Sequence, residues 1–214
     1  MIRDSSETRK VLERARHGDS SGWSELVARH RERLRRMVAL RMDRRLQRRI
    51  DASDVIQEAY LEAWTRLAEY LRAPTMPFFL WLRFLTAQRL VTLHRKHLGV
   101  QMRDPAVEVS LYHGGLPQTS SAALAAQLLG RDTRPSEAAI RAEMRVRLQE
   151  ALNSMDPLDR EILALRHFEQ LSRAEIAHLL RIQDTAVSKR YIRALKRLKD
   201  LLSSLPGGAS EFRL

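Results

Sequence analysis

The sequence predicts an all-α protein with two helical domains joined by a flexible linker. Apolar residues recur at spacings of three and four over long stretches, as in amphipathic helices, and the alternating runs typical of strands are missing. Glycine and aromatic residues are few, at 8 glycines and 6% Phe, Trp and Tyr in 214 residues. This composition agrees with long helices and not with a sheet protein.

Net charge and helix-breaking residues divide the chain into three parts. Residues 1–103 carry a net charge of +10, residues 104–139 carry −2 and residues 140–214 carry +4. The middle part contains prolines and glycines, and a connector longer than about 15 residues is unusual inside one compact domain. The expected divisions are a first domain at 1–98, a linker at 99–138, a second domain at 139–205 and a tail at 206–214.

The first domain begins with an apolar stripe between residues 26 and 38, which predicts a helix, followed by the arginine-rich segment RMDRRLQRRI. A second helix is expected over residues 51–71, which start with capping residues and continue without proline or glycine. One face of this second helix is apolar and is predicted to be buried. Its members are Val55, Ile56, Ala59, Tyr60, Ala63, Trp64 and Leu67.

The opposite face of the same helix is acidic, although the domain is basic, and it has a leucine near its centre. Its members are Asp54, Gln57, Glu58, Leu61, Glu62 and Thr65. Such a face suits a protein partner, because charge steers the encounter and an apolar residue ringed by polar groups provides affinity. A solvated face with one exposed leucine is the commoner origin of this pattern.

Pro74 and Pro77 frame the loop RAPTMP, which precedes a helix that starts with FFLWLRFLTAQRL and ends with HRKHLG. The first turns are apolar on nearly all sides, so we expect most of their aromatic residues in the core. Aromatic groups beside a basic helix also suit single-stranded DNA, whose bases stack and whose backbone follows positive charge. His94 and His97 lie at the basic end of this helix and are expected on the surface.

Two further elements are expected in the C-terminal half. Within the linker, SSAALAAQLLG predicts a short helix capped by Ser120 or Ser121 and ended by Gly130. Residues 171–202 predict a helix-turn-helix, in which Ser172 and Glu175 form a capping box and residues 181–183 make the turn.

The second helix of this motif has an apolar face and a basic face. The expected packing residues are Val187, Tyr191, Ala194, Leu195, Leu198 and Leu202. The basic face suits the major groove of DNA, where Thr185, Lys189, Arg193 and Lys196 would face the bases and Arg190 and Arg197 the phosphates. A solvated basic face on a bundle helix is the alternative.

The overall charge favours a polyanionic partner. Lys and Arg number 38 against 26 Asp and Glu, for a net charge of +12 and a pI near 11.0. Nucleic acid and an anionic membrane surface both fit. No apolar run approaches the ~20 residues that span a bilayer, and the N-terminus lacks the apolar core of a signal peptide, so we expect a cytoplasmic protein without membrane insertion. Without cysteine, a phosphate-binding glycine loop or a nucleophile–base arrangement, no enzyme, metal or cofactor is expected.

Three motifs together resemble the extracytoplasmic-function (ECF) group of bacterial sigma-70 family sigma factors, the two-domain initiation subunits of RNA polymerase. DASDVIQEAYLEAW resembles the polymerase-binding helix of sigma domain 2, and FFLWLRFLTAQRLVTLHRK resembles its promoter-melting helix. ALNSMDPLDREILALRHFEQLSRAEIAHLL followed by TAVSKRYIRALKRL resembles sigma domain 4. The resemblance covers most of the chain, although the last motif alone also fits response-regulator output domains.

The resemblance implies partners and site residues. Binding to core RNA polymerase is implied for Asp54, Gln57, Glu58, Leu61 and Glu62. Contact with the minus-ten promoter element, including capture of a flipped base by the loop at residues 72–77, is implied for Arg72, Thr75, Met76, Trp81, Gln88, Arg95 and Lys96. Contact with the minus-thirty-five element is implied for Thr185, Lys189, Arg190, Arg193, Lys196 and Arg197. An anti-sigma factor is usual for the family.

Three positions depart from the family pattern. Arg181 stands where the turn usually has glycine, so either the turn is made without a residue that tolerates positive φ or the preceding helix is longer. Gln88 and Thr92 replace a usual Asn and a common Asp, so the base preference at minus ten does not transfer.

The sequence therefore predicts a sigma factor that binds core polymerase, recognises both promoter elements and promotes strand opening. The alternative is a stand-alone dimeric helix-turn-helix transcriptional regulator, which would bind its operator without polymerase. An all-α enzyme or scaffold has little support from the residues.

Overall fold

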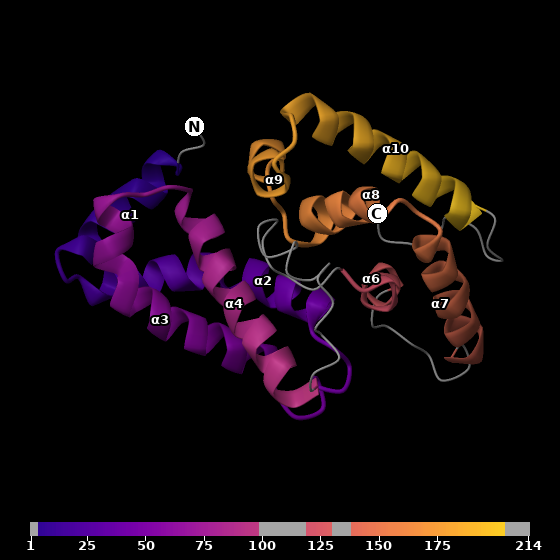
Figure 1. Cartoon of the computed structure of the whole chain (residues 1–214), viewed down its shortest axis with the longest axis horizontal. Helices are drawn as coiled ribbons and strands as arrows, with labels where there is room; N and C mark the ends of the chain where they lie inside the picture. The colour runs from indigo at the N-terminus through magenta and orange to yellow at the C-terminus, as the bar shows by residue number, and fades with distance from the viewer. Residues whose placement is uncertain (1–3, 99–118, 130–137, 204–214) are drawn as a thin grey trace. The chain divides into compact units, whose positions relative to one another are not determined.

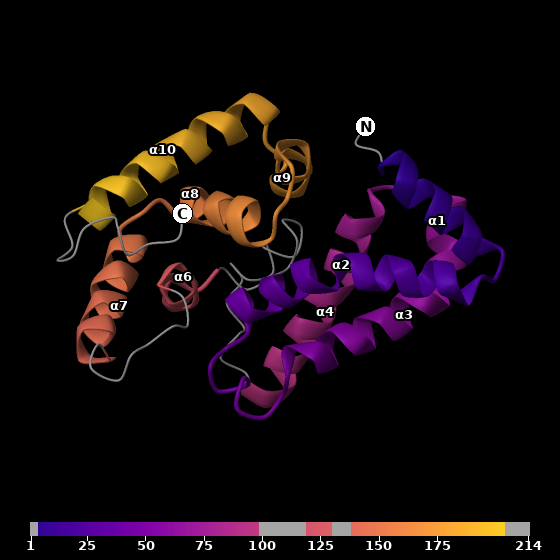
Figure 2. The same cartoon turned by 180° about the vertical axis from the view of Figure 1, so that it is seen from behind.

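The computed structural model describes residues 4–98, 119–129 and 138–203, and no strand occurs among them (Figures 1 and 2). The all-α prediction is confirmed. The chain splits into two compact units, Met1–Pro117 with His178–Arg181 and Gln118–Ala177 with Ile182–Leu214, and each is described by itself. The expected tail and most of the expected linker lie outside the described residues, so the domain limits stay a prediction.

The described residues 4–98 of the first unit form the four helices α1 (Ser6–Arg16), α2 (Ser20–Arg41), α3 (Ala52–Arg72) and α4 (Phe78–Leu98). Helices α2, α3 and α4 pack against one another, and α1 packs on α2 (Figure 1). Its largest fully buried side chains are Leu26, Leu34, Met37, Leu40, Ile56, Phe78, Leu82, Leu85 and Leu90. The apolar stripe of residues 26–38 thus faces the core as predicted.

Helix α1 was not predicted from the sequence. Its sequence, SETRKVLERAR, is mostly polar, and only Val11, Leu12 and Ala15 contribute buried apolar side chains. Ser5 caps the helix by accepting a hydrogen bond from the Thr8 N–H at 3.1 Å. A helix with so few apolar positions gives a weak periodic signal, and its packing on α2 supplies the missing stability.

His94 is buried in the first unit with 3% of its surface exposed, so the expectation of a surface residue is wrong. The segment that follows α2 covers it, and the Asp43 N–H donates to His94 Nε2 at 3.3 Å. Burial lowers the pKa of His94. His97 is exposed, as expected.

The helix expected within the linker is present as α6 (Ser121–Leu128), with Ser120 as its cap. It packs on α7 (Ala138–Asn153), and the Thr119 hydroxyl donates to Glu161 Oε2 at 2.7 Å. This part of the expected linker therefore belongs to the second compact unit.

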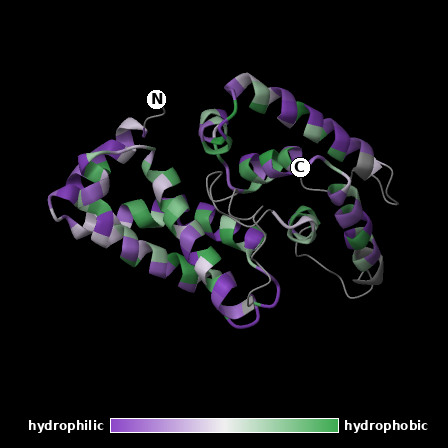
Figure 3. Ribbon diagram, in the orientation of Figure 1, coloured by the Kyte–Doolittle hydropathy of each residue, from purple (hydrophilic) through white to green (hydrophobic). Residues whose placement is uncertain are grey.

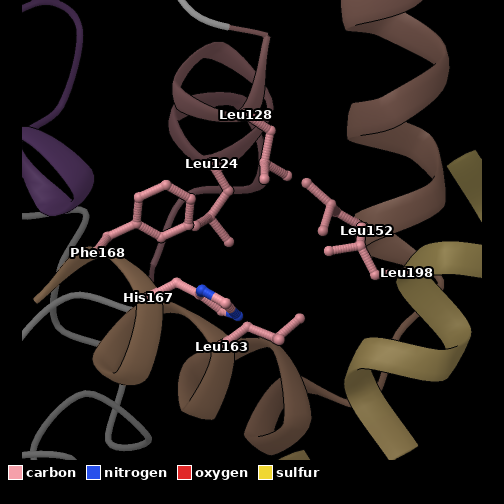
Figure 4. Close-up of a pocket in the computed structure, with 7 residues that line it drawn as sticks. All are labelled: Leu124, Leu128, Leu152, Leu163, His167, Phe168 and Leu198. Atoms are coloured by element: carbon pink, nitrogen blue, oxygen red, sulfur yellow. The ribbon is translucent and has the colours of Figure 1, made fainter. Parts of the chain in front are cut away.

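An apolar pocket lies where α6 meets the rest of the second unit (Figure 4). Its lining residues are Leu124, Leu128, Leu152, Leu163, His167, Phe168 and Leu198. The His167 ring, the polar member of this lining, has Nε2 2.9 Å from the Tyr191 hydroxyl. The pocket is thus a seam between packed leucines, and α6 contributes apolar burial to the second core.

The rest of the second unit consists of α8 (Pro157–Leu163), the π-helical turn η3 (Ala164–Phe168), α9 (Arg173–Leu180) and α10 (Asp184–Ser203). Helix α10 packs on α8 and α7. Helix α9 is described with this unit because Arg173 forms an ion pair of 2.6 Å with Asp184 of α10. Among the described helices, none combines the length and apolar character needed to cross a bilayer.

Candidate functional site

The acidic face of α3 begins at a capped helix terminus. Asp51 accepts from the Ser53 N–H at 2.6 Å, and Asp54 accepts from the Asp51 N–H at 3.2 Å, which completes a capping box. Backbone donation from Ser53 lowers the pKa of Asp51. Asp54 therefore stabilises the helix start while its side chain stays on the exposed face.

Leu61 lies at the centre of this face and is 64% exposed, which confirms its predicted exposure. Gln57 and Glu58 are also exposed, one turn earlier on the same side. The opposite face of α3 supplies the packing with the core, so Leu61 is not needed for it. Its position permits a contact with another molecule.

Trp64 extends the apolar part of this face. It was predicted to be buried, but 44% of its surface is exposed, so that prediction is wrong for this residue. The reason is that Trp64 stands at the edge of the buried face, where its ring lies 5.3 Å from that of Trp23 on α2. Leu61 and Trp64 are three residues apart and share one side of the helix.

Glu62 is less available than its position in the sequence suggested. Its carboxylate lies 3.1 Å from Arg66 on α3 and 3.1 Å from Arg89 on α4. The side chain is only partly exposed, and these two arginines compensate its charge. The acidity of the face is therefore concentrated at Asp54 and Glu58.

The loop between α3 and α4, residues 73–77, is held at its ends. The Tyr70 hydroxyl donates to the Met76 carbonyl oxygen at 2.9 Å, and the Asp4 carboxylate accepts from the Phe78 N–H at 2.9 Å. Arg72 and Thr75 are exposed, and Met76 is half-buried.

Trp81 does not present its ring to solvent. It is 8% exposed and stacks on Tyr70, with ring centroids 4.5 Å apart and planes 18° apart. A base cannot stack on a ring face that Tyr70 already covers. The structure thus places Trp81 in the core, and we do not retain it as a base-contacting residue.

Farther along α4, Gln88, Thr92 and Arg95 share one exposed side, with Lys96 at its edge. The Thr92 hydroxyl donates to the Gln88 carbonyl oxygen at 2.9 Å, so it is directed along the helix. The predicted DNA-contacting residues at this end of α4 are therefore gathered on one basic, polar surface.

The helix-turn-helix forms as predicted. Ser172 Oγ accepts from the Glu175 N–H at 3.2 Å, and Glu175 Oε2 accepts from the Ser172 N–H at 2.7 Å. Arg181 adopts a φ of 53°, and the Ile182 N–H donates to the Ala177 carbonyl oxygen at 3.1 Å, a Schellman-type ending. The turn is thus made by a non-glycine residue in the left-handed region, at a cost of about 1 kcal/mol.

Arg190 and Arg193 of α10 bind Asp159 of α8. Arg193 donates to both carboxylate oxygens, at 2.8 and 3.0 Å, and Arg190 donates to Oδ1 at 2.6 Å. Burial alone would raise the pKa of Asp159, whose side chain is 7% exposed, but the hydrogen bonds from Arg193 and Arg190 lower it below the ordinary value. The same hydrogen bond raises the pKa of Arg193.

Arg197 continues this row by donating to the Ser154 carbonyl oxygen at 2.9 Å. Three of the six residues predicted to contact the minus-thirty-five element therefore hold α10 against the α7–α8 region. The other three, Thr185, Lys189 and Lys196, lie on the side of α10 opposite its core, where all are exposed. The alternation of hydrophilic and hydrophobic residues along α10 is visible in Figure 3.

Ile192 belongs to the same exposed side and was missed in the sequence. It is 66% exposed and lies one turn from both Lys189 and Lys196. Its seven-residue spacing from Thr185 is the signal that could have identified it. No group of three or more His, Asp or Glu side chains suited to a metal ion occurs in the described parts of the chain.

Comparison with known proteins finds similarity to sigma factors. The family model described as Sigma-70, region 4 matches residues 145–198, which include most of α7 and all of α8 to α9. The probable RNA polymerase sigma factor RfaY of Xanthomonas campestris pv. campestris is 30% identical over 151 residues, which are 71% of this chain and 34% of RfaY. The ECF RNA polymerase sigma factor SigD of Mycobacterium tuberculosis is 33% identical over 151 residues, which are 71% of this chain and 63% of SigD.

The solved structure of CnrH in complex with the cytosolic domain of CnrY has a similar fold. It aligns with a TM-score of 0.53 and 22% identity and covers 93% of this chain and 99% of that chain. Over 71% of its length the chain is similar to these sigma factors, and its residues 145–198 match the Sigma-70, region 4 family model. The chain spans less than two thirds of the length of RfaY and SigD. Sigma factors as a class bind core RNA polymerase and promoter DNA.

Proposed function

We propose that this chain is a sigma factor that binds core RNA polymerase, recognises the minus-thirty-five and minus-ten elements and promotes strand opening. The observation that carries the proposal is Leu61, 64% exposed on a helix that also presents Asp54, Gln57 and Glu58. The proposed role of the chain involves binding and no covalent chemistry.

Helix α3 would be the polymerase-binding element. Leu61 supplies an apolar anchor, and the exposed edge of Trp64 enlarges it, because aromatic residues are frequent hot spots in interfaces. Asp54 and Glu58 steer a basic partner surface toward the anchor. We expect Glu62 to contribute less, since Arg66 and Arg89 already compensate its charge.

The loop at residues 73–77 and the basic side of α4 would bind the opened minus-ten strand. Arg72, Thr75 and Met76 surround the loop, and the Gln88 side of α4 leads to Arg95 and Lys96. The proposed order is capture of a flipped base at the loop and electrostatic contact with the backbone along α4.

Helix α10 would contact the minus-thirty-five duplex through its exposed side. The exposed residues Thr185, Lys189 and Lys196 would make hydrogen bonds and phosphate contacts, and Ile192 would offer an apolar group of the kind that contacts a thymine methyl. Arg190, Arg193 and Arg197 act mainly by holding this helix in place. The Arg193 side chain is 60% exposed, so a phosphate contact in addition to Asp159 is compatible with its geometry.

We further propose that the chain acts in the cytoplasm and is restrained by an anti-sigma factor. Restraint by an anti-sigma factor is supported by the fold similarity to CnrH, whose structure was solved in complex with the cytosolic domain of CnrY.

Reconstitution with purified core polymerase tests the function. We expect the chain to co-elute with core enzyme and to support run-off transcription from a promoter taken upstream of its own gene. A dimer that binds a duplex operator unaided, with no co-elution, would favour the alternative of a stand-alone transcriptional regulator.

A further inference from the structure

We propose that Asp4 is a positioning residue for minus-ten DNA, because its carboxylate holds the loop at residues 73–77 against the start of α4. This inference rests on the proposed function of that loop. Asp4 precedes α1 and is separated in sequence by 74 residues from the N–H group that it binds.

The first step is the cap of α4. The Trp81 N–H donates to the Pro77 carbonyl oxygen at 3.0 Å, so Pro77 occupies the capping position. A proline side chain has no acceptor and cannot cap the exposed N–H groups. The Asp4 carboxylate takes this place: its two oxygens lie 2.9 and 3.1 Å from the Phe78 nitrogen. Its negative charge also suits the positive end of the helix.

The second step is the connection to the loop. The Tyr70 hydroxyl donates to the Met76 carbonyl oxygen at 2.9 Å and lies 3.4 Å from Asp4 Oδ2. Burial raises the pKa of Tyr70 further above neutrality, so its hydroxyl remains a proton donor. The Asp4 carboxylate thus contacts both the end of α3 and the start of α4, which are the two ends of the loop.

The third step is the consequence for DNA. The loop between Arg72 and Phe78 has five residues, of which two are prolines, so its course depends strongly on how its ends are held. Thr75 and Met76 can meet a flipped base only if that course is maintained. A loop already held in place avoids an ordering cost when the strand binds.

Full-length variants combined with core polymerase test this role. We expect Asp4→Ala to weaken binding of a single-stranded minus-ten oligonucleotide by about tenfold, the value of one hydrogen bond to a charged group. Core polymerase affinity and duplex minus-thirty-five binding should not change. Asp4→Asn, which keeps an acceptor for the Phe78 N–H, should recover much of the loss.

Ser5→Ala is the matched control, because Ser5 caps α1 and makes no contact with the Phe78 N–H. An equal loss with Ser5→Ala would overturn the proposal, since the effect would then come from α1. Tyr70→Phe should weaken oligonucleotide binding, and its effect should be less than additive with that of Asp4→Ala. Full additivity would contradict a shared connection.

Hydrogen exchange of the Phe78 amide gives a readout that is independent of DNA. It should accelerate in Asp4→Ala, and unchanged exchange would overturn the capping role. Unchanged oligonucleotide binding by a folded Asp4→Ala variant would overturn the positioning role alone. If the unmodified holoenzyme fails to bind the minus-ten oligonucleotide, the proposed function itself fails.

Discussion

Helices α3 and α10 both bury one side and expose the other, but they expose different chemistry. The exposed side of α3 carries Leu61 and Trp64 beside carboxylates, whereas that of α10 carries lysines around a single isoleucine. Apolar anchors give affinity for another protein, while cations give affinity for a polyanion through counterion release. The difference supports the proposal that the two helices bind different partners.

The two helices also agree in one respect. In each, some charges expected at the partner are instead used inside the unit: Glu62 with Arg89 in the first, Arg193 with Asp159 in the second. The charge counted on a helical face therefore overstates what a partner meets. Residues on the side farthest from neighbouring helices are the ones left for binding.

The largest expected effect comes from placing a charge at the exposed apolar residue of α3. Leu61→Asp should weaken binding to core polymerase by about 100-fold, in the range of interface hot spots, because it places a charge in an apolar contact. Pull-down and fluorescence titration with core enzyme measure this loss. Circular dichroism should stay unchanged, since the side chain is exposed.

Ile192→Asp is the reciprocal control on α10, at an equally exposed isoleucine. It should leave assembly with core polymerase intact and weaken duplex minus-thirty-five binding. If both variants lost polymerase equally, the division of roles between the helices would be wrong.

Removing the charge of Asp159 should show whether Arg190 and Arg193 hold α10 in place or bind DNA. We expect Asp159→Asn to lower the free energy of unfolding by about 2 kcal/mol, because the buried carboxylate loses charge-assisted hydrogen bonds to two partly exposed arginines. The released Arg190 and Arg193 should at the same time raise nonspecific DNA affinity. Chemical denaturation and filter binding measure the two changes.

Asp156→Asn is the matched control, because Asp156 is exposed and asparagine can still cap α8. It should change stability little. A fall in DNA affinity with Asp159→Asn, without any loss of stability, would show that the arginines need Asp159 in order to contact DNA.

Acid should affect the first unit through His30. Burial against Phe79, aided by Arg33 and Arg29, lowers the pKa of His30 to about 4. Below about pH 6.5 the unfolded chain binds a proton that the folded chain does not, so the free energy of unfolding falls as the pH is lowered, by about 2 kcal/mol at pH 5. Thermal unfolding measured from about pH 7.5 down to about pH 5 should show this loss.

His30→Leu should flatten this pH dependence, because it removes the titrating group from an apolar site. An unchanged slope would assign the acid response to other groups, of which His94 in the same unit and His167 in the second also have lowered pKa values.

The smallest effect is expected for a single lysine on α10. Lys196→Ala should weaken duplex binding on all sequences alike and reduce the salt slope of the binding constant by about one, as for loss of one phosphate contact. Titrations over a range of salt concentrations measure the slope. Arg145→Ala, an exposed cation on α7, is the control and should leave the slope unchanged.

The sequence by itself determined the helical class, the Ser172–Glu175 capping box, the turn at residues 181–183 and the exposed position of Leu61. Each depends on residues within a few positions of one another, where backbone geometry dictates which side chains share a face. Helix α1 escaped prediction because its local apolar signal is weak and its stability comes from α2.

Only the tertiary structure decided which polar groups remain available to partners. Asp159 meets Arg193 across 34 residues, Asp43 meets His94 across 51 and Asp4 meets Phe78 across 74. Such pairs depend on how helices pack, which local spacing does not specify. For the same reason the partial exposure of Trp64, beside Trp23 at the edge of the buried face, did not follow from its position in a helical pattern.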